Sequence, residues 1–396
     1  MMNKFPVNSP EWLIKEIQEK GGMISFYDFM DIVLNDQING YYGSGKANIG
    51  ISGDFVTSPS LSEDFSFFLA IQIEEWLSQI KSNNNFNESQ SIIEFGSGRG
   101  CLIKGLINYF SDNNEQILKN ISFKIVELNQ GMRIKQEESL KHFLNNGVDI
   151  SWIKLDDLED KSINGIVIAN EVLDAFPVER IQYSEGQIYQ QCVSFNEKDG
   201  EIFLLKNNLN ENLKERINYL KSNFGINIPP DNAQEGWTTE LHMHHSEWLM
   251  QINNKLKMGV LLIIDYAIES RKYYSTQKKD GTILAYKNQK VLNEVLFSPG
   301  DCDLTCHICS DILIKQAKDI GFRLNGMVKQ GEALLLLGLA EKLYSIQNSC
   351  KNDLSKALLK REALLRMVDP HCLGDFKWFI FEVSEDNYKF KSKCIH

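Results

Sequence analysis

The chain has 396 residues and a net charge of −11 at neutral pH, with 43% hydrophobic and 24% charged residues. This length allows a core domain with a cap or an insertion, and the composition is that of an ordinary globular protein. The acidic balance argues against nucleic acid as a partner, because a phosphate backbone needs a basic face.

The sequence shows no pattern that predicts export or membrane insertion. Residues 1–28 mix Lys and Glu, lack an apolar run of signal-peptide length and are not the Arg-rich, acid-poor segment typical of a transit peptide. The longest apolar runs, 259–264 and 333–337, are far shorter than a membrane span. We therefore expect a cytoplasmic protein with reduced cysteines and no membrane span, and we leave open a homodimer.

Residues 1–89 are predicted to form a helical cap followed by a covering loop. A helix over 26–34 follows a serine with an acid three residues later, which is a capping box. The segment 40–59 is rich in glycine and is expected to be a loop. Apolar residues at helical spacing over 61–80 predict a long packed helix.

Four strand-and-helix units follow. Strands are predicted at 92–95, 122–126, 150–155 and 165–169, and each ends in a polar residue. Repeated units of this kind build a doubly wound, mostly parallel α/β sheet. Ligands of such sheets bind beyond the carboxyl ends of the strands.

The regular alternation of strands and helices is interrupted after the fourth unit and then resumes. Residues 178–240 alternate like antiparallel strands and include a helix, so we expect an inserted α+β segment inside a core that spans 90–340. Strands at 322–328 and 332–338 are predicted to close this core as a hairpin. Residues 341–396 are predicted to form a C-terminal helical extension.

The first predicted strand leads into a glycine turn of the form G-x-G-x-G. It places Glu94, Gly96, Gly98 and Gly100 before a helix whose first N–H groups are unpaired. The dinucleotide fingerprint G-x-G-x-x-G has a wider second gap for a pyrophosphate, so this spacing counts against an NAD oxidoreductase. The turn resembles motif I of the class I S-adenosylmethionine (SAM) methyltransferases, which implies that these four residues hold the cofactor.

The ends of the next three strands carry further candidates. Glu127 ends the second strand, where a carboxylate accepts from both hydroxyls of a ribose. Asp156 ends the third, where an acid accepts from an adenine amino group. Asn170 ends the fourth, and Glu171 and Asp174 follow it on one side of a first helical turn. A surface acid or a helix cap is the structural alternative at these positions.

These blocks together resemble the MidA family of class I SAM methyltransferases, whose mitochondrial members are complex I assembly methyltransferases. The matching blocks are 40–42, 53–59, 94–100, 170–177, 265–266, 280–282, 299–300, 303–305, His307 and 330–332. They span nearly the whole chain in order. The resemblance implies a Rossmann-like class I fold with an N-terminal cap, SAM as cofactor and methylation of an arginine on a protein partner.

The resemblance also assigns residues in the cap. It implies that Asp54, Thr57 and Ser58 belong to the cofactor site. Two departures stand out, since Ser60 occupies a position where an acid is expected and Gln289 one where a histidine is expected. In addition, Ala267 replaces a usual glycine after 265–266. The departures at Ser60 and Gln289 keep open a SAM-fold assembly factor without turnover, and a small-molecule methyltransferase is the other alternative.

Four residues are candidates for catalysis. Glu171 and Asp174 suit an arginine acceptor, because carboxylates bind a guanidinium bidentately and draw its charge away from the attacking nitrogen. Glu240, at the end of the insertion, is a candidate for the substrate mouth, with an exposed acid as the simpler alternative. His307 is a candidate for the released proton, with a packed or capping histidine as the alternative.

We expect no metal. Cys302, Cys306 and Cys309 have the spacing of a radical-SAM cluster, but they lie late in the chain, inside a block that the family resemblance explains. The cluster at His242, His244 and His245 lacks the spacing of a zinc motif.

Overall fold

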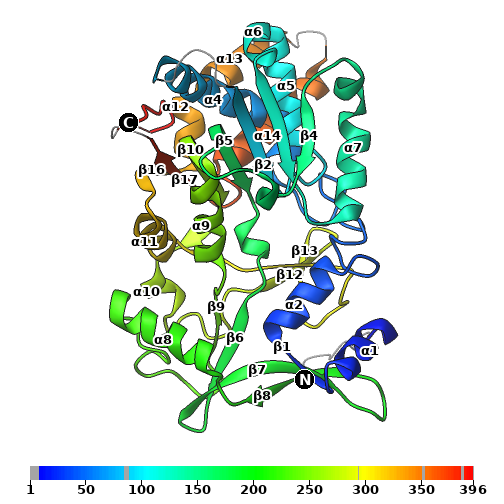
Figure 1. Cartoon of the computed structure of the whole chain (residues 1–396). Coiled ribbons are helices and arrows are strands. Elements are labelled where there is room, and N and C mark those ends of the chain that lie inside the picture. The colour runs from blue at the N-terminus through cyan, green and yellow to red at the C-terminus, as the bar shows by residue number, and fades with distance from the viewer. Residues whose placement is uncertain (1–8, 84–88, 293, 350–352, 385–387, 396) are drawn as a thin grey trace.

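The computed structural model describes residues 9–83, 89–292, 294–349, 353–384 and 388–395. The chain forms an upper lobe around a large sheet and a lower lobe around a smaller one (Figure 1). The first eight residues of the segment predicted to carry no targeting signal lie outside the described residues. No helix in the described part of the chain is long and apolar enough to cross a membrane.

A seven-stranded sheet forms the upper lobe. Its strands are β2 (Gln90–Phe95), β3 (Ile121–Val126), β4 (Ile150–Ile153), β5 (Ile163–Asn170), β10 (Leu256–Asp265), β16 (Arg323–Lys329) and β17 (Lys377–Val383). They lie in the order β16-β17-β10-β5-β2-β3-β4. The five strands from β10 to β4 pair in parallel, whereas β17 is antiparallel to both of its neighbours. The doubly wound sheet is confirmed, and its strand order reverses between β2 and β5, where such sheets open a ligand crevice.

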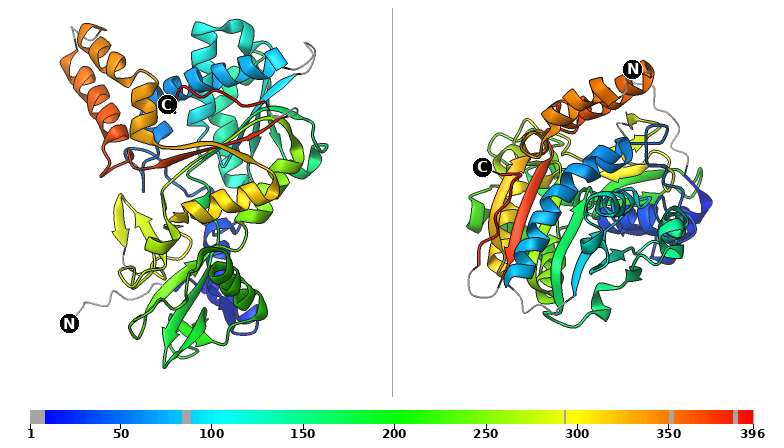
Figure 2. Two further views of the ribbon diagram at one scale, coloured as in Figure 1. Left: turned by 90° about the vertical axis from the view of Figure 1, so that its left-hand side faces the viewer. Right: turned by 90° about the horizontal axis from the view of Figure 1, so that it is seen from above.

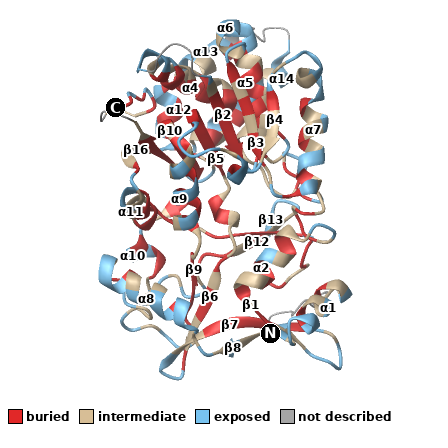
Figure 3. Ribbon diagram, viewed as in Figure 1, coloured by how far each residue is buried: buried red, intermediate tan, exposed pale blue. Residues whose placement is uncertain are grey.

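Helices cover both faces of this sheet. They include α4 (Glu63–Asn83), α5 (Cys101–Asn113), α7 (Gln130–Asn145), α9 (His245–Lys255) and α11 (Ser310–Ile320). Ile166 and Ile168 of β5 pack in the core with α4 and α5, while Val167 between them packs in the core with α9 and α11. The strand is buried along its whole length (Figure 3), which is why it reads as a continuous apolar run.

The lower lobe joins the N-terminal cap to the insertion. It contains α1 (Glu11–Glu19), β1 (Met23–Ser25), α2 (Phe26–Asn35), β6 (Glu179–Ser184), β7 (Gln187–Phe195), β8 (Ile202–Asn207), α8 (Glu211–Phe224) and β9 (Thr238–Leu241). Strand β1 of the cap pairs antiparallel with β7 of the insertion, with Ile24 opposite Val193. Both residues lie in one hydrophobic core, so the cap and the insertion form a single lobe.

Short elements lie between the lobes and around the crevice. They are α3 (Ser58–Leu61), η1 (Leu155–Asp157), η2 (Leu173–Ala175), β11 (Ala267–Ile268), α10 (Ser270–Tyr273), β12 (Leu284–Lys287), β13 (Lys290–Leu292), β14 (Asp303–Thr305) and β15 (Ile308–Cys309). Another short helix, α6 (Glu115–Leu118), joins α5 to β3 at the far end of the upper lobe (Figure 1). Strands β13, β12 and β14 form a small antiparallel sheet.

The C-terminal part differs from the prediction. Residues 332–338 do not form the second strand of a hairpin, because α12 (Gln330–Leu336) occupies this segment, and α13 (Leu339–Ser349) and α14 (Leu354–Val368) follow it. A short apolar run does not distinguish a strand from a buried helix by periodicity alone. The tail is also more than a helical extension, since β17 lies inside the main sheet between β10 and β16. Figure 2 shows α13 and α14 standing out from this side of the lobe.

The glycine-rich loop after α2 is anchored on the upper lobe by a close backbone approach. The Gly131 N–H donates to the Gly43 carbonyl at 3.1 Å. A Cβ on Gly131 would lie 2.2 Å from the Gly45 nitrogen, so only glycine fits at the start of α7. The loop is tied to itself as well, because the Tyr41 hydroxyl donates to the Asp54 carboxylate at 2.9 Å.

We expect Gly131→Ala to loosen this loop. The added methyl group collides with backbone, and overpacking of this kind costs about 1–3 kcal/mol. Chemical denaturation should show that loss, and limited proteolysis should cut faster near Gly45. Glu138→Ala, on an exposed position of the same helix, is the matched control. Equal stability and equal cleavage of the two variants would contradict the close approach.

Candidate active site

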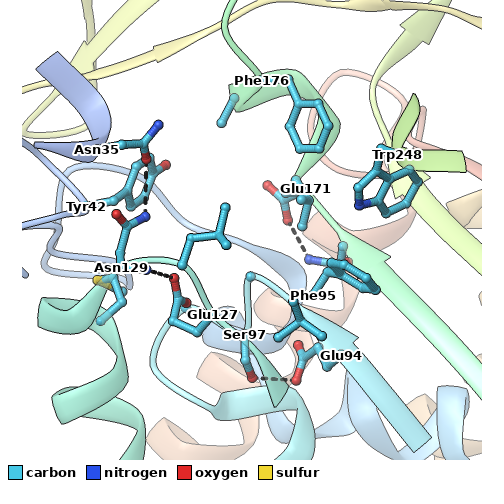
Figure 4. Close-up of a pocket in the computed structure, with 18 of the residues that line it drawn as sticks. Asn35, Tyr42, Glu94, Phe95, Ser97, Glu127, Asn129, Glu171, Phe176 and Trp248 are labelled. Carbon is cyan, nitrogen blue, oxygen red and sulfur yellow. Dashed lines mark hydrogen bonds between the residues drawn. The ribbon is translucent and has the colours of Figure 1, made fainter. Parts of the chain in front are cut away.

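A cavity of about 660 Å³ opens at the carboxyl ends of β2, β3, β4 and β5 (Figure 4). We call it the cofactor cavity. Both lobes line it, because α2, the loop before α3 and α9 contribute as well as the strand ends. The sequence-predicted residues in its lining are Thr57, Glu94, Gly96, Gly98, Glu127, Asp156, Asn170 and Glu171.

The glycine turn shapes the floor of this cavity. Gly96 and Gly98 have φ values of 56° and 53°, a region that disfavours side chains. The Ser97 hydroxyl donates to Glu94 at 2.5 Å, and burial raises the pKa of Glu94 to about 7 against that hydrogen bond. Gly100 does not line the cavity; it precedes α5 at φ 77°, and its N–H donates to the Ser97 carbonyl at 2.7 Å.

Glu127 is held with both oxygens facing donors. Its carboxylate accepts from the Asn129 N–H at 2.9 Å and from the Gln136 amide at 2.7 Å, while burial raises its pKa. Gln136 also donates to the Gly98 carbonyl at 3.1 Å. One buried amide therefore links the glycine turn to Glu127, the acid that is predicted to bind the ribose. Gln136 was not predicted as a site residue. The sequence shows only an uncharged polar residue on a predicted helix, and the structure shows that this face of the helix is buried.

The cavity lining fits SAM. The side-chain oxygens of Asn129 and Asn170 are buried and have no hydrogen-bond partner within the described part of the chain. Buried acceptors need donors, and SAM offers an ammonium, two ribose hydroxyls and an adenine amino group. Asp156 lies exposed at the rim, where its carboxylate is a further acceptor. The unpaired N–H groups at the start of α5 suit the carboxylate of the methionyl part.

A second cavity, of about 470 Å³, adjoins the first. We call it the acidic cavity, because its lining carboxyls are Asp54, Glu171, Asp174, Asp303 and Asp375. Glu171 lines both cavities, together with Tyr42 and Phe55. A group that enters the acidic cavity therefore meets the cofactor cavity at Glu171.

Burial and mutual repulsion raise the pKa values of these carboxyls. Burial, reinforced by the charge of Asp174, raises the pKa of Glu171 and that of Asp303 to about 8. Burial raises the pKa of Asp174 to about 6, although the Tyr266 hydroxyl donates to it at 2.6 Å. Glu171 and Asp303 therefore hold protons at neutral pH, and an entering cation would favour their ionised forms.

The main chain fixes Glu171 and Asp174 in place. Glu171 has a φ of 53°, which is uncommon for a residue with a side chain, and its N–H donates to the Ile264 carbonyl at 2.8 Å. The Asp265 carboxylate accepts from the N–H groups of Leu173 and Asp174 at 3.1 and 3.2 Å. Asp265 was not among the predicted site residues, although its position directly after the apolar run 259–264 was a usable signal.

Asp303 is another functional candidate that sequence reasoning missed. It lies on β14, and the Tyr42 hydroxyl from the cap donates to it at 2.8 Å. It belonged to a block that resembles the family, but only His307 was selected from that region. His307 lines the acidic cavity too; burial lowers its pKa to about 4, and its Nδ1 has no partner among the described residues.

Two predicted cofactor residues lie elsewhere. Ser58 is fully buried, and the Gln330 amide donates to its hydroxyl at 3.0 Å. Asp54 lines the acidic cavity rather than the cofactor cavity, and its carboxylate accepts from the Asn288 N–H at 2.9 Å. The loop thus presents Thr57 to the cofactor cavity and Asp54 to its neighbour.

The structure corrects the placement of Glu240, which was a candidate for the substrate mouth. Its side chain is fully buried and lines neither cavity. Its carboxylate accepts from the Thr282 N–H at 2.9 Å and from the Tyr273 hydroxyl at 3.1 Å, and it lies 3.7 Å from the Arg180 guanidinium. Glu240 and Arg180 are cross-strand partners in β9 and β6, so the sheet register turns this acid inward.

The departures from the family pattern at Ser60 and Gln289 lie at the site. Ser60 lines the cofactor cavity and completes a capping box with Thr57 at the start of α3. Gln289 lines the acidic cavity, and its side-chain amide donates to the Ile51 carbonyl. Both residues thus stabilise the covering loop.

The cysteine and histidine clusters have structural partners. Cys302, Cys306 and Cys309 are buried, and they are divided between two hydrophobic cores. His242 stacks on His245 with ring centroids 4.5 Å apart. Within the described ranges, no group of three His, Cys, Asp or Glu side chains is arranged to hold a metal ion.

Comparison with known proteins adds three findings. Residues 68–328 match a family model described as "Putative S-adenosyl-L-methionine-dependent methyltransferase". The chain is 30% identical to the mitochondrial protein arginine methyltransferase NDUFAF7 of Rattus norvegicus over 89% of this chain and 79% of that protein. It is 27% identical to the mitochondrial homologue of Caenorhabditis elegans over 86% of this chain and 79% of that protein.

Solved structures agree with the architecture. A Burkholderia thailandensis protein bound to S-adenosyl-homocysteine is 25% identical, with a TM-score of 0.79 over 94% of this chain and 91% of that chain. A native crystal structure of a protein from the same organism gives a TM-score of 0.77 at 24% identity, over 97% of this chain and 92% of that chain.

The expected cytoplasmic location is contradicted by these comparisons, because the named relatives are mitochondrial proteins. The expectation rested on terminal composition and on the absence of an export signal. Cellular location is determined by targeting signals that receptors recognise, and the packing of the folded core does not encode it.

We expect Glu127→Gln to weaken binding in the cofactor cavity. The amide keeps the shape but loses the charge that a diol prefers, and hydrogen bonds to charged groups contribute about 1.5–3 kcal/mol, or roughly tenfold or more in Kd. Calorimetric titration with S-adenosyl-homocysteine measures the change. Glu137→Gln, at the position directly after Gln136 in α7 and outside the cavity lining, should bind like the wild type. Equal affinity of both variants would exclude Glu127 from the site.

Proposed function

The chain belongs to the MidA family of SAM-dependent methyltransferases, and we propose that it methylates an arginine side chain of a protein. The observation that carries this proposal is the acidic cavity, which meets the cofactor cavity at Glu171. The names of the Rattus norvegicus and Caenorhabditis elegans relatives agree with it. SAM is the cofactor, and when bound it supplies an electrophilic methyl group.

Several residues are proposed to hold the cofactor. Glu127 would accept from the ribose, Asn170 and Glu94 would accept from other donors of the cofactor, and Gly96 and Gly98 would let it approach the backbone. Thr57 and Asp156 complete the lining from the cap and from η1. Gly100 and Ser58 act on this site indirectly, because they shape the turn and the loop.

The acidic cavity is suited to a guanidinium. That group is always charged and is a poor nucleophile. Glu171 and Asp174 lie in the turn after β5, and Asp303 lies in β14, so carboxyls from two separate segments reach it. Hydrogen bonds to these carboxylates orient the guanidinium and draw positive charge away from the nitrogen that faces the cofactor.

The released proton is better matched to a carboxyl than to His307. Burial keeps the pKa of His307 at about 4, which makes it a weak base near neutral pH. Glu171 and Asp303, with pKa values raised to about 8, are stronger bases in the same cavity. We therefore propose His307 as a neutral wall of the cavity. Glu240 acts only through the buried network that holds Thr282.

We expect Glu171→Gln to abolish methyl transfer while cofactor binding persists. The neutral amide keeps the size of the side chain but cannot pair with a cation. Labelled SAM with a cell lysate measures transfer, and titration with S-adenosyl-homocysteine measures binding. Glu159→Gln, at an exposed position, is the control. Undiminished labelling by Glu171→Gln would remove Glu171 from the mechanism.

Methyl transfer should rise with pH between about 7 and 9. Glu171 and Asp303 lose their protons as the pH passes their raised pKa values, and only the ionised carboxyls pair with the guanidinium. Initial rates at saturating SAM isolate this effect, because Glu94 in the cofactor cavity also has a raised pKa, about 7. A rate that falls across this range would contradict the proposal.

The nature of the acceptor separates the proposal from its alternatives. Mass spectrometry of labelled lysate should find methylarginine in peptides. Label confined to small molecules would indicate a small-molecule methyltransferase. The homodimer stays a prediction, which light scattering on the full chain measures.

A further inference from the structure

One side chain in the acidic cavity has a charge that the proposed reaction does not use. Among the described residues that line this cavity, Arg366 alone carries a permanent positive charge. It lies in the last turn of α14 and is half-buried. It does not line the cofactor cavity, so it lies away from the junction at Glu171.

The Arg366 guanidinium has no hydrogen bond or ion pair within the described part of the chain. The Arg366 carbonyl accepts from the Leu373 N–H at 3.2 Å. The nearby carboxylate of Asp375 already pairs with Lys329 at 2.7 Å and with Lys377 at 3.2 Å. The guanidinium therefore has no counter-charge within the described part of the chain, and the cavity wall leaves its five N–H donors available to a ligand.

A helix C-terminus explains part of this placement. A positive charge in the last turn interacts favourably with the unpaired carbonyl groups, and a lysine would serve equally well there. The planar fork of arginine matches a carboxylate bidentately, which lysine does not. The helix end therefore explains why residue 366 is positively charged. It does not explain why the residue is an arginine whose guanidinium lies unpaired on the wall of a cavity.

Arg366 also affects which target arginine side chains the acidic cavity accepts. A target guanidinium that enters alone is attracted by Glu171, Asp174 and Asp303 but is repelled by Arg366. A substrate that brings its own carboxylate satisfies both ends of the cavity. Such a combination of attraction and repulsion is how sites discriminate between related ligands.

We propose that Arg366 binds a carboxylate of the protein substrate beside the target arginine, so that the enzyme selects arginines with a neighbouring Asp or Glu. This inference rests on the proposed function. Arg366 is then a specificity residue, and Glu171 holds the reacting group.

The test uses the full-length protein, labelled SAM and a cell lysate, with mass spectrometry of the methylated peptides. Wild-type sites should carry an acidic residue close to the methylated arginine. Arg366→Gln should lower labelling of these sites roughly tenfold, as expected for the loss of a charge-assisted bidentate pair. With a purified substrate the loss should appear in KM rather than in kcat.

Two control variants separate specificity from structure. Arg366→Lys keeps the charge at the helix end and should fold like the wild type, yet it should label acidic-context sites more weakly. Arg361→Gln, on an exposed position of α14, should label them normally. S-adenosyl-homocysteine affinity should not change in any of the three variants. Thermal unfolding should not change in Arg366→Lys or Arg361→Gln, and Arg366→Gln should lose only the small stabilisation by a charge at the helix end.

Other results overturn the inference in distinguishable ways. Methylated arginines without acidic neighbours, or full labelling by Arg366→Gln, would overturn it while the proposed function stands. Absence of any methylarginine with SAM bound would overturn the proposed function and this inference together.

Discussion

The carboxylate of Asp265 is the contact on which the site depends. Strands β5 and β10 run in parallel side by side, so the end of one lies against the turn that follows the other. Asp265 accepts two N–H groups of that turn and thereby fixes Asp174, while Glu171 is bound to the neighbouring Ile264 carbonyl. The proposed acceptor side of the reaction is thus part of the sheet edge, and its rigidity is that of the sheet.

The cofactor cavity depends on both lobes. Glu94 and Glu127 belong to the main sheet, whereas Tyr42 comes from the cap and reaches Asp303. The Asn129 amide donates to Asn35 of α2 at 3.2 Å, which joins the edge of the cofactor cavity to the lower lobe. Because the cap shares a sheet with the insertion, a change in either segment is transmitted to the site through packing.

Local patterns in the sequence were sufficient for the core fold and for much of the cofactor site. Continuous apolar strands, the glycine turn and polar strand ends indicated a doubly wound sheet, and Glu94, Glu127, Asp156 and Asn170 all line the predicted cavity. Such features are local, since a few consecutive residues determine them. The prediction of a second hairpin strand was wrong, because a short apolar run is equally compatible with a buried helix.

The sequence by itself determined the order of the βα units, the glycine turn and the acids that follow the strands, because backbone preference and hydrophobic period act over short distances. Only the tertiary structure decided which acids meet. It buried Glu240 against Arg180, brought Asp303 and Arg366 into one cavity with Glu171, and placed β17 inside the sheet. These outcomes depend on sheet register and on contacts between segments far apart in the chain, which no local pattern encodes.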